Sequence, residues 1–192
     1  MRLTSWLVGL LGVATSVCAA QPCRIEVVEQ GDGWPVPGVE LRTVHGVRLV
    51  SDNAGLIACD LPELMGRETW FTVHGHGYGV KADGFGYSGV RLTPKPGQTL
   101  KVTVERTILA RRLGRLTGAG LFAESQKLGE QLDWKESGVL GSDSVVTAKL
   151  GGKLLWFWGD TNLAHYPLGI FNVSAASTDK FLPPAKPPLR PP

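Results

Sequence analysis

The chain has 192 residues, of which 43% are hydrophobic and 19% are charged, with 25 Gly and 13 Pro. This composition excludes a disordered polyelectrolyte, which has fewer apolar residues and a larger net charge. The abundant Gly and Pro favour many turns between short strands over long helices. A formal net charge of +3 is too small to indicate a polyanionic partner, and we predict no nucleic-acid partner.

The first twenty residues have the pattern of an export signal. Arg2 precedes an apolar run over residues 6–17, and Cys18-Ala19-Ala20 supplies small residues at the cleavage position. The run is shorter than the roughly 20 apolar residues that a transmembrane helix needs. We therefore predict a signal peptide over 1–20, export from the cytoplasm, and a mature chain without a transmembrane segment.

The mature chain would keep two cysteines, Cys23 and Cys59. An oxidising compartment allows a disulfide to form and persist. By restricting the unfolded chain, such a bridge would stabilise the fold by roughly 3 to 4 kcal/mol. Because spacing does not reveal the separation of the two Cα atoms, two buried free thiols are the alternative to a disulfide.

Residues 21–106 are predicted to form a domain of short strands and turns. Alternating or apolar runs occupy residues 24–28, 40–44, 47–50, 56–59, 70–73 and 100–104. Asp52, Asn53 and Gly55 suit a tight hairpin turn between two of these runs. Six or seven strands in about 85 residues favour an antiparallel β-sandwich.

The turn motifs of this region resemble those of a known family. Val36-Pro37-Gly38-Val39-Glu40-Leu41, Ser51-Asp52-Asn53-Ala54-Gly55-Leu56, Leu61-Pro62 and Gly77-Tyr78 follow one another as in the prealbumin-like sandwiches that regulate carboxypeptidases. Ser51 replaces the usual Thr, and residues 74–89 are longer and richer in Gly than the usual connection. The resemblance implies a prealbumin-like fold and an accessory role without catalysis.

Residues 107–140 are predicted to be a basic linker with a short helix. Lys101 to Arg115 carries five basic residues against one acidic residue. Leu109, Leu113 and Leu116 have the spacing of one helix face. We interpret this segment as a helix that docks on its neighbour. The alternative, a patch for nucleic acid or anionic lipid, lacks the interleaved aromatic residues that such patches use.

The clearest local pattern is a β-hairpin over residues 145–158. Gly151-Gly152 provides a two-residue turn, so Leu150 faces Lys153 and Asp143 faces Asp160 at the open end. Paired carboxylates about 5 Å apart at Cβ serve in glycoside hydrolysis as acid and as base or nucleophile. The alternative assigns the two Asp residues to a strand cap and a solvated turn.

This region is similar to the opening blade of five-bladed β-propeller glycosidases. The similarity rests on residues 142–146 and 152–161, with Ser144 where many such enzymes have Pro, and it implies that Asp143 is the acid facing the axial cleft. Too few residues follow Asp143 for a propeller of at least four blades. We therefore predict an incomplete propeller-like module over 141–178, without catalysis, and a flexible Pro-rich tail over 179–192.

Two further groups of residues are candidate ligand sites. His74 and His76 would share one side of a strand, with Asp83 as a third ligand of a divalent metal ion; otherwise we expect no cofactor. The alternative is a surface loop that binds glycan. The aromatic candidates for carbohydrate are Tyr78, Phe85, Tyr87, Trp156 and Trp158, of which the two Trp residues alternatively pack in a core.

Together these patterns predict an exported, mainly β protein, with an antiparallel β-sandwich followed by a β-hairpin module. The leading functional hypothesis is a non-catalytic accessory or binding module for carbohydrate that is related to a longer propeller protein. The first alternative is a glycan hydrolase that uses Asp143 and Asp160, and the second is metal binding at His74 and His76.

Overall fold

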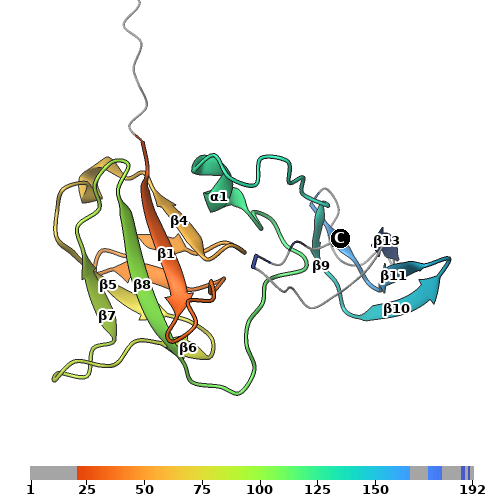
Figure 1. Cartoon of the computed structure of the whole chain (residues 1–192), viewed down its shortest axis with the longest axis horizontal. Helices are drawn as coiled ribbons and strands as arrows, with labels where there is room; N and C mark the ends of the chain where they lie inside the picture. Colours follow the sequence, from red (N-terminus) through yellow and green to blue (C-terminus); the bar gives the residue numbers. More distant parts are fainter. Residues whose placement is uncertain (1–20, 165–172, 179–186, 189, 191–192) are drawn as a thin grey trace, which may run out of the picture.

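The computed structural model describes residues 21–164, 173–178, 187, 188 and 190 (Figure 1). The described residues are mainly β, with 41% strand and 5% helix, and none of their sheets closes into a barrel. The predicted signal peptide and most of the predicted tail lie outside the described residues. No helix in the described part of the chain is long and apolar enough to cross a membrane.

Two four-stranded sheets form the first part of the chain, residues 22–106, which we call the two-sheet module. Its strands are β1 (Cys23–Glu29), β2 (Glu40–Thr43), β3 (Arg48–Val50), β4 (Leu56–Cys59), β5 (Thr69–His74), β6 (Tyr78–Gly79), β7 (Gly89–Leu92) and β8 (Thr99–Arg106). A short 3₁₀ helix, η1 (Pro62–Leu64), follows β4. The sheet orders are β4-β1-β8-β6 and β3-β2-β5-β7, and all neighbours are antiparallel except β1 and β8.

Alternating residues of both sheets build one hydrophobic core. In β1, Cys23, Ile25 and Val27 are buried, while the residues between them are partly exposed. Leu41 and Phe71 from the other sheet belong to the same cluster. Each fully buried apolar side chain contributes about 1.5 to 3 kcal/mol, so this shared core holds the two sheets together.

The turn over residues 51–55 forms, but the prediction that it closes a hairpin was wrong. The strands on either side of it, β3 and β4, belong to different sheets, so the chain crosses the core here. The backbone N–H of Asp52 donates to Leu56 O over 3.0 Å, and Gly55 has a φ of +70°. A Cβ at Gly55 would stand 2.7 Å from Val27 O, so this turn requires glycine.

Residues 107–138, which we call the docking segment, contain the one α-helix of the described chain, α1 (Ala123–Lys127). The helix predicted around Leu109, Leu113 and Leu116 is absent, and Leu109 is fully exposed. The backbone there is held by the two-sheet module in place of helical hydrogen bonds. For example, Arg112 N donates to the Tyr78 hydroxyl over 3.0 Å, and Arg115 N donates to Asn53 Oδ1 over 2.9 Å.

The docking segment covers the outer edge of β4 (Figure 1). All four residues of β4 are buried: Ile57 and Cys59 point into the core of the two-sheet module, while Leu56 and Ala58 alternate with them and lie outside that core. Glu124 accepts a hydrogen bond from Ala58 N over 2.9 Å. This segment is therefore packed on the two-sheet module.

The described residues between 139 and 178, which are 139–164 and 173–178, form the hairpin module. Its strands are β9 (Val139–Gly141), β10 (Val145–Leu150), β11 (Lys153–Trp158), β12 (Asn162–Leu163) and β13 (Ser174–Thr178), in the orders β10-β11-β13 and β12-β9. The predicted hairpin is confirmed, because Leu150 pairs with Lys153 and Val145 pairs with Trp158. Gly151 and Gly152 have φ values of +58° and +78°, as the predicted turn requires.

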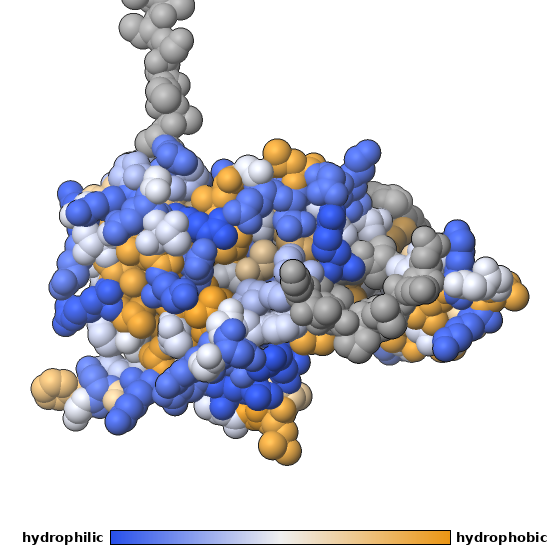
Figure 2. All heavy atoms as spheres, viewed as in Figure 1, coloured by the Kyte–Doolittle hydropathy of each residue, from blue (hydrophilic) through white to orange (hydrophobic). Residues whose placement is uncertain are grey.

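Strand β10 is the most exposed strand of the described chain, since all six of its residues are exposed. Figure 2 shows hydrophobic surface at the far end of the hairpin formed by β10 and β11. β10 carries exposed Val145, Val146 and Leu150. Within the described residues, its only strand neighbour is β11.

Candidate functional site

One face of the sheet β3-β2-β5-β7 points away from the core, and we call it the outer face. In β5, Phe71 and Val73 are buried, so Trp70, Thr72 and His74 project to the other side. Residues directly opposite each other in neighbouring strands share a face. The register therefore adds the following residues to the outer face: Glu40, Arg42, Arg48, Val50, Gly89 and Arg91.

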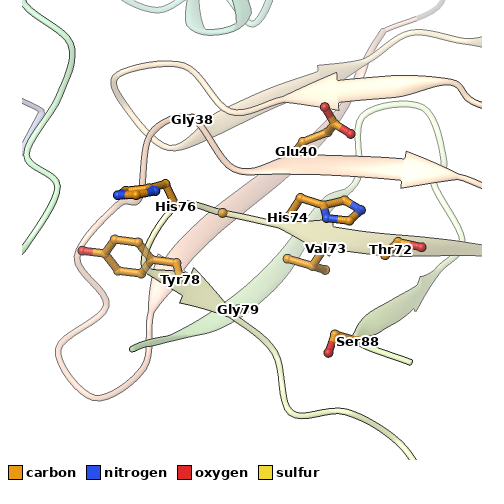
Figure 3. A pocket seen from close by; sticks show the side chains of 10 residues that line it. Gly38, Glu40, Thr72, Val73, His74, His76, Tyr78, Gly79 and Ser88 are labelled. Atoms are coloured by element: carbon orange, nitrogen blue, oxygen red, sulfur yellow. The ribbon is translucent and has the colours of Figure 1, made fainter. Parts of the chain in front are cut away.

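A depression of about 600 Å³ lies at the His74 end of the outer face (Figure 3). Its lining includes Glu40, Thr72 and His74 from the outer face, and Ser88 from the chain entering β7. Carboxylate, hydroxyl and imidazole groups therefore meet at one open surface. They offer both donors and acceptors of hydrogen bonds, which is the chemistry that a polyhydroxylated ligand requires.

The arginines of the outer face form ion pairs with two glutamates. Arg42 Nε lies 3.6 Å and Arg48 Nε lies 3.9 Å from Glu40 Oε1, and Arg91 Nη1 lies 3.3 Å from Glu68 Oε1. The three arginines share two carboxylates, so this region keeps only a small net positive charge for a polyanion.

His74 is held by one of the same arginines. Arg42 Nη2 lies 2.9 Å from His74 Nε2. A guanidinium has donors only, so His74 Nε2 accepts this hydrogen bond, and the neutral imidazole carries its proton on Nδ1. His74 thus presents an N–H donor for a ligand.

Trp70 supplies a flat apolar surface at the other end of β5. Its indole lies against Gly89, since a Cβ there would stand 2.5 Å from Trp70 Cζ2, and Arg91 lies over the ring at 5.5 Å from its centroid. A second depression of about 420 Å³ is lined by Trp70, Thr69 and residues of η1. Trp70 is partly exposed, so the outer face combines an aromatic surface with hydrogen-bonding groups.

The predicted metal site does not assemble. β5 ends at His74, and Gly75 bridges to Tyr78 in a turn, so His74 and His76 do not share one side of a strand. In Figure 3 their two imidazole rings point away from each other. Asp83 instead accepts hydrogen bonds from Phe85 N and Tyr87 N within its own loop, over 2.9 Å each. No group of three or more His, Cys, Asp or Glu side chains suited to a metal ion occurs in the described chain.

The three aromatic residues predicted in the Gly-rich region differ in their exposure to solvent. Phe85 is 89% exposed and Tyr87 is 66% exposed, on a loop whose ends, Gly79 and Ser88, both line the depression in Figure 3. Tyr78 is 4% exposed and belongs to the core, and its hydroxyl accepts a hydrogen bond from Arg112 N. Tyr78 also lines the depression in Figure 3, and its role in binding stays a prediction.

Asp143 and Asp160 line one depression of about 430 Å³, together with Gly141, Ser142 and Asn162. The hairpin continues beyond its last regular pair, because Gly159 N donates to Ser144 O over 3.1 Å and Asp143 N donates to Gly159 O over 3.3 Å. Asp143 N thus bonds to Gly159 O where the regular register would use Ser144 N, so the regular pairing ends here and the direct opposition of Asp143 and Asp160 stays a prediction. Their catalytic roles stay predictions.

Trp156 and Trp158 are each 6% exposed, so neither offers a face to a sugar from solvent. Their rings stack on each other with centroids 6.3 Å apart. Trp156 Nε1 also donates to Thr178 Oγ1 of β13 over 3.2 Å. Alternation along β11 turns both residues toward the inside of the hairpin module, and their role in binding carbohydrate stays a prediction.

Sequence reasoning missed Trp70, Thr72, Arg42 and Arg91 as candidate binding residues. The alternation of Trp70-Phe71-Thr72-Val73 was visible as a strand, but alternation alone does not tell which side faces solvent. The sequence did contain one signal for the exposed side: Trp and Thr alternate with the more hydrophobic pair Phe and Val.

Comparisons of the chain with protein-family models, with curated proteins and with solved structures found no match.

Proposed function

We propose that the two-sheet module is a non-catalytic carbohydrate-binding module of an exported protein, and that the outer face is its binding surface. The proposal rests on one observation: the indole of Trp70 lies against Gly89, on the same sheet face as Thr72 and His74. Sugar rings combine apolar faces with hydroxyl groups, so they suit an aromatic surface beside donors and acceptors.

The charge pattern and the shape of the outer face favour a neutral glycan. The arginines of the face are paired with Glu40 and Glu68, which leaves little attraction for an acidic polymer. The depressions at the two ends of β5 are open, as a surface for part of a longer chain requires. Phe85 and Tyr87, on the loop beside the first depression, extend the aromatic surface.

The proposal has two further parts. The two sheets have a prealbumin-like arrangement, and the hairpin module has a propeller-like origin. The shared core of the two sheets supports the first. The antiparallel order β10-β11-β13, with its Gly-Gly turn, supports the second.

Replacing Trp70 by alanine should weaken glycan binding roughly tenfold or more, because a loss of about 1.4 kcal/mol already lowers affinity tenfold. Trp70→Phe, which keeps an aromatic face, should retain most of the affinity. An array of neutral and acidic oligosaccharides identifies the ligand, and titration calorimetry with that ligand measures the affinities.

Trp34→Ala is the matched control, since Trp34 is also partly exposed and has an arginine, Arg111, 5.2 Å from its ring centroid. Trp34 lies outside the outer face, and its removal should leave affinity unchanged. An array without any bound glycan, or equal losses in both alanine variants, would contradict the proposed function.

A second candidate function is glycan hydrolysis at Asp143 and Asp160, and their shared depression of about 430 Å³ favours it. If the two carboxylates act as acid and base, the chain should release reducing ends from a glycan that it binds. Asp143→Asn and Asp160→Asn should each abolish this release without changing affinity at the outer face. Absence of any release from bound glycans by the unaltered chain rules out this second function.

A further inference from the structure

Two cysteines lie opposite each other where β4 meets β1. Cys23 and Cys59 are register partners of this antiparallel pair, and both are fully buried as free thiols. Both point into the core with Ile25 and Ile57, which lie two residues away on the same strands. Directly opposite Cα atoms of antiparallel strands are about 4.5 to 5.5 Å apart. Disulfides span Cα separations of about 4.4 to 6.8 Å, so this pair meets the distance requirement.

We infer that Cys23 and Cys59 are a site of oxidation to a disulfide, which fastens β4 to β1 and thereby secures the docking segment on the two-sheet module. Within the described chain, β4 has one strand neighbour, β1. The outer edge of β4 receives the docking segment through the hydrogen bond from Ala58 N to Glu124. The attachment of the docking segment therefore depends on how firmly β4 is held.

The same bridge would enclose the turn that anchors the docking segment. Asp52 and Asn53 lie within the loop that a bond between Cys23 and Cys59 closes. Asp52 accepts hydrogen bonds from the backbone and side chain of Ser125, and Asn53 pairs with the backbone of Arg115. Closing the loop lowers the conformational entropy of the unfolded chain, and so stabilises the anchors together with β4.

The chemistry is thiol–disulfide exchange with a small-molecule or protein disulfide as the oxidant. The thiolate of one cysteine attacks the oxidant, forming a mixed disulfide and releasing one oxidant thiol. The thiolate of the second cysteine then attacks the cysteine sulfur of the mixed disulfide and expels the second oxidant thiol. Two protons and two electrons pass from the cysteines to the oxidant, so the exchange is balanced.

Oxidation must take place while the chain folds. In the folded protein neither cysteine is exposed, and burial raises the pKa of both thiols, which lowers the fraction of reactive thiolate. The bond therefore forms before β4 closes over β1. Once formed, it is shielded from reductants by the same burial.

The bond is tested on the full chain, refolded with a mixture of oxidised and reduced glutathione and then alkylated in denaturant. Mass spectrometry should find one alkylated cysteine, Cys18, before reduction and all three cysteines of the sequence after it. Proteolytic digestion should yield a linked peptide pair that holds Cys23 and Cys59, also from a Cys18→Ser chain. Three reactive thiols before reduction, or a bridge that involves Cys18, overturns the inference.

The fastening role is tested by trypsin digestion of the same protein after refolding with or without reductant. The reduced chain should be cleaved several-fold faster within the docking segment and should melt several degrees lower. A chain carrying both Cys23→Ala and Cys59→Ala should show equal cleavage under the two conditions. Equal cleavage of the oxidised and reduced unaltered chain refutes the fastening role, and the mass result alone decides whether the bond exists.

Discussion

Replacing Asp52 by alanine should lower the free energy of unfolding by about 3 to 4 kcal/mol and release the docking segment. The buried carboxylate of Asp52 accepts hydrogen bonds from Ser125 N and Ser125 Oγ, each over 2.6 Å. It also accepts from Ala54 N over 2.9 Å and Leu56 N over 3.3 Å. Alanine leaves these donors without their acceptor, and each buried unpaired donor costs about 1 to 3 kcal/mol.

Urea denaturation measures this loss of stability, and trypsin digestion at Arg111, Arg112 and Arg115 measures release of the docking segment. Asp60→Ala removes an exposed carboxylate at the end of β4 and should change stability by less than about 0.5 kcal/mol. Asp52→Asn keeps one acceptor oxygen, so its loss of stability should lie between those of Asp52→Ala and Asp60→Ala. A cleavage pattern of Asp52→Ala identical to that of the unaltered chain would show that the docking segment is held by other contacts.

Replacing Glu29 by alanine should destabilise the chain by about 3 kcal/mol, because two arginines would lose the buried carboxylate that pairs with both. Glu29 Oε1 lies 3.0 Å from Arg106 Nε, and Oε2 lies 3.0 Å from Arg111 Nε, while the Glu29 side chain is 6% exposed. The hydrogen bond to Glu29 is the main cause that raises the pKa of Arg111, so this guanidinium stays charged. Without Glu29, the start of the docking segment loses its ionic attachment to β1.

Glu105→Ala is the control for this prediction, since Glu105 is an exposed glutamate next to Arg106 in β8. Thermal denaturation should show a clear fall in Tm for Glu29→Ala and a change near zero for Glu105→Ala. Similar shifts in the two variants would mean that net charge, and not the buried ion pair, determines the stability.

Local patterns predicted the elements whose partners are close in the sequence. The hairpin of β10 and β11 has its turn, its alternation and its register within fourteen residues, so two glycines determine which residues face each other. For the same reason, the sequence placed Asp143 and Asp160 at one open end. The predicted helix around Leu109 failed because hydrogen bonds to Tyr78 and Asn53, far away in the sequence, hold that backbone in another conformation.

The binding face depended on information that no local pattern carries. Alternation marked residues 70–73 as a strand, yet the burial of Phe71, which turns Trp70 outward, comes from packing against the other sheet. Likewise, Gly89 receives the indole of Trp70 only because β7 pairs with β5. A one-residue shift of that pairing would move the side chains of β7 to the opposite face of the sheet. The composition of the outer face therefore depends on the register between strands.

The amino-acid sequence by itself determined that this protein is mainly β, where most strands lie, and how the double-glycine hairpin pairs, because these properties follow from turn chemistry and from alternation between neighbouring residues. Tertiary structure alone decided that Cys23 faces Cys59, that Asp52 binds Ser125, and that the side of β5 carrying Trp70 and His74 faces away from the core. These arrangements result from packing between segments distant in the chain, and the free energy gained by burying their side chains depends on contacts that no local pattern contains.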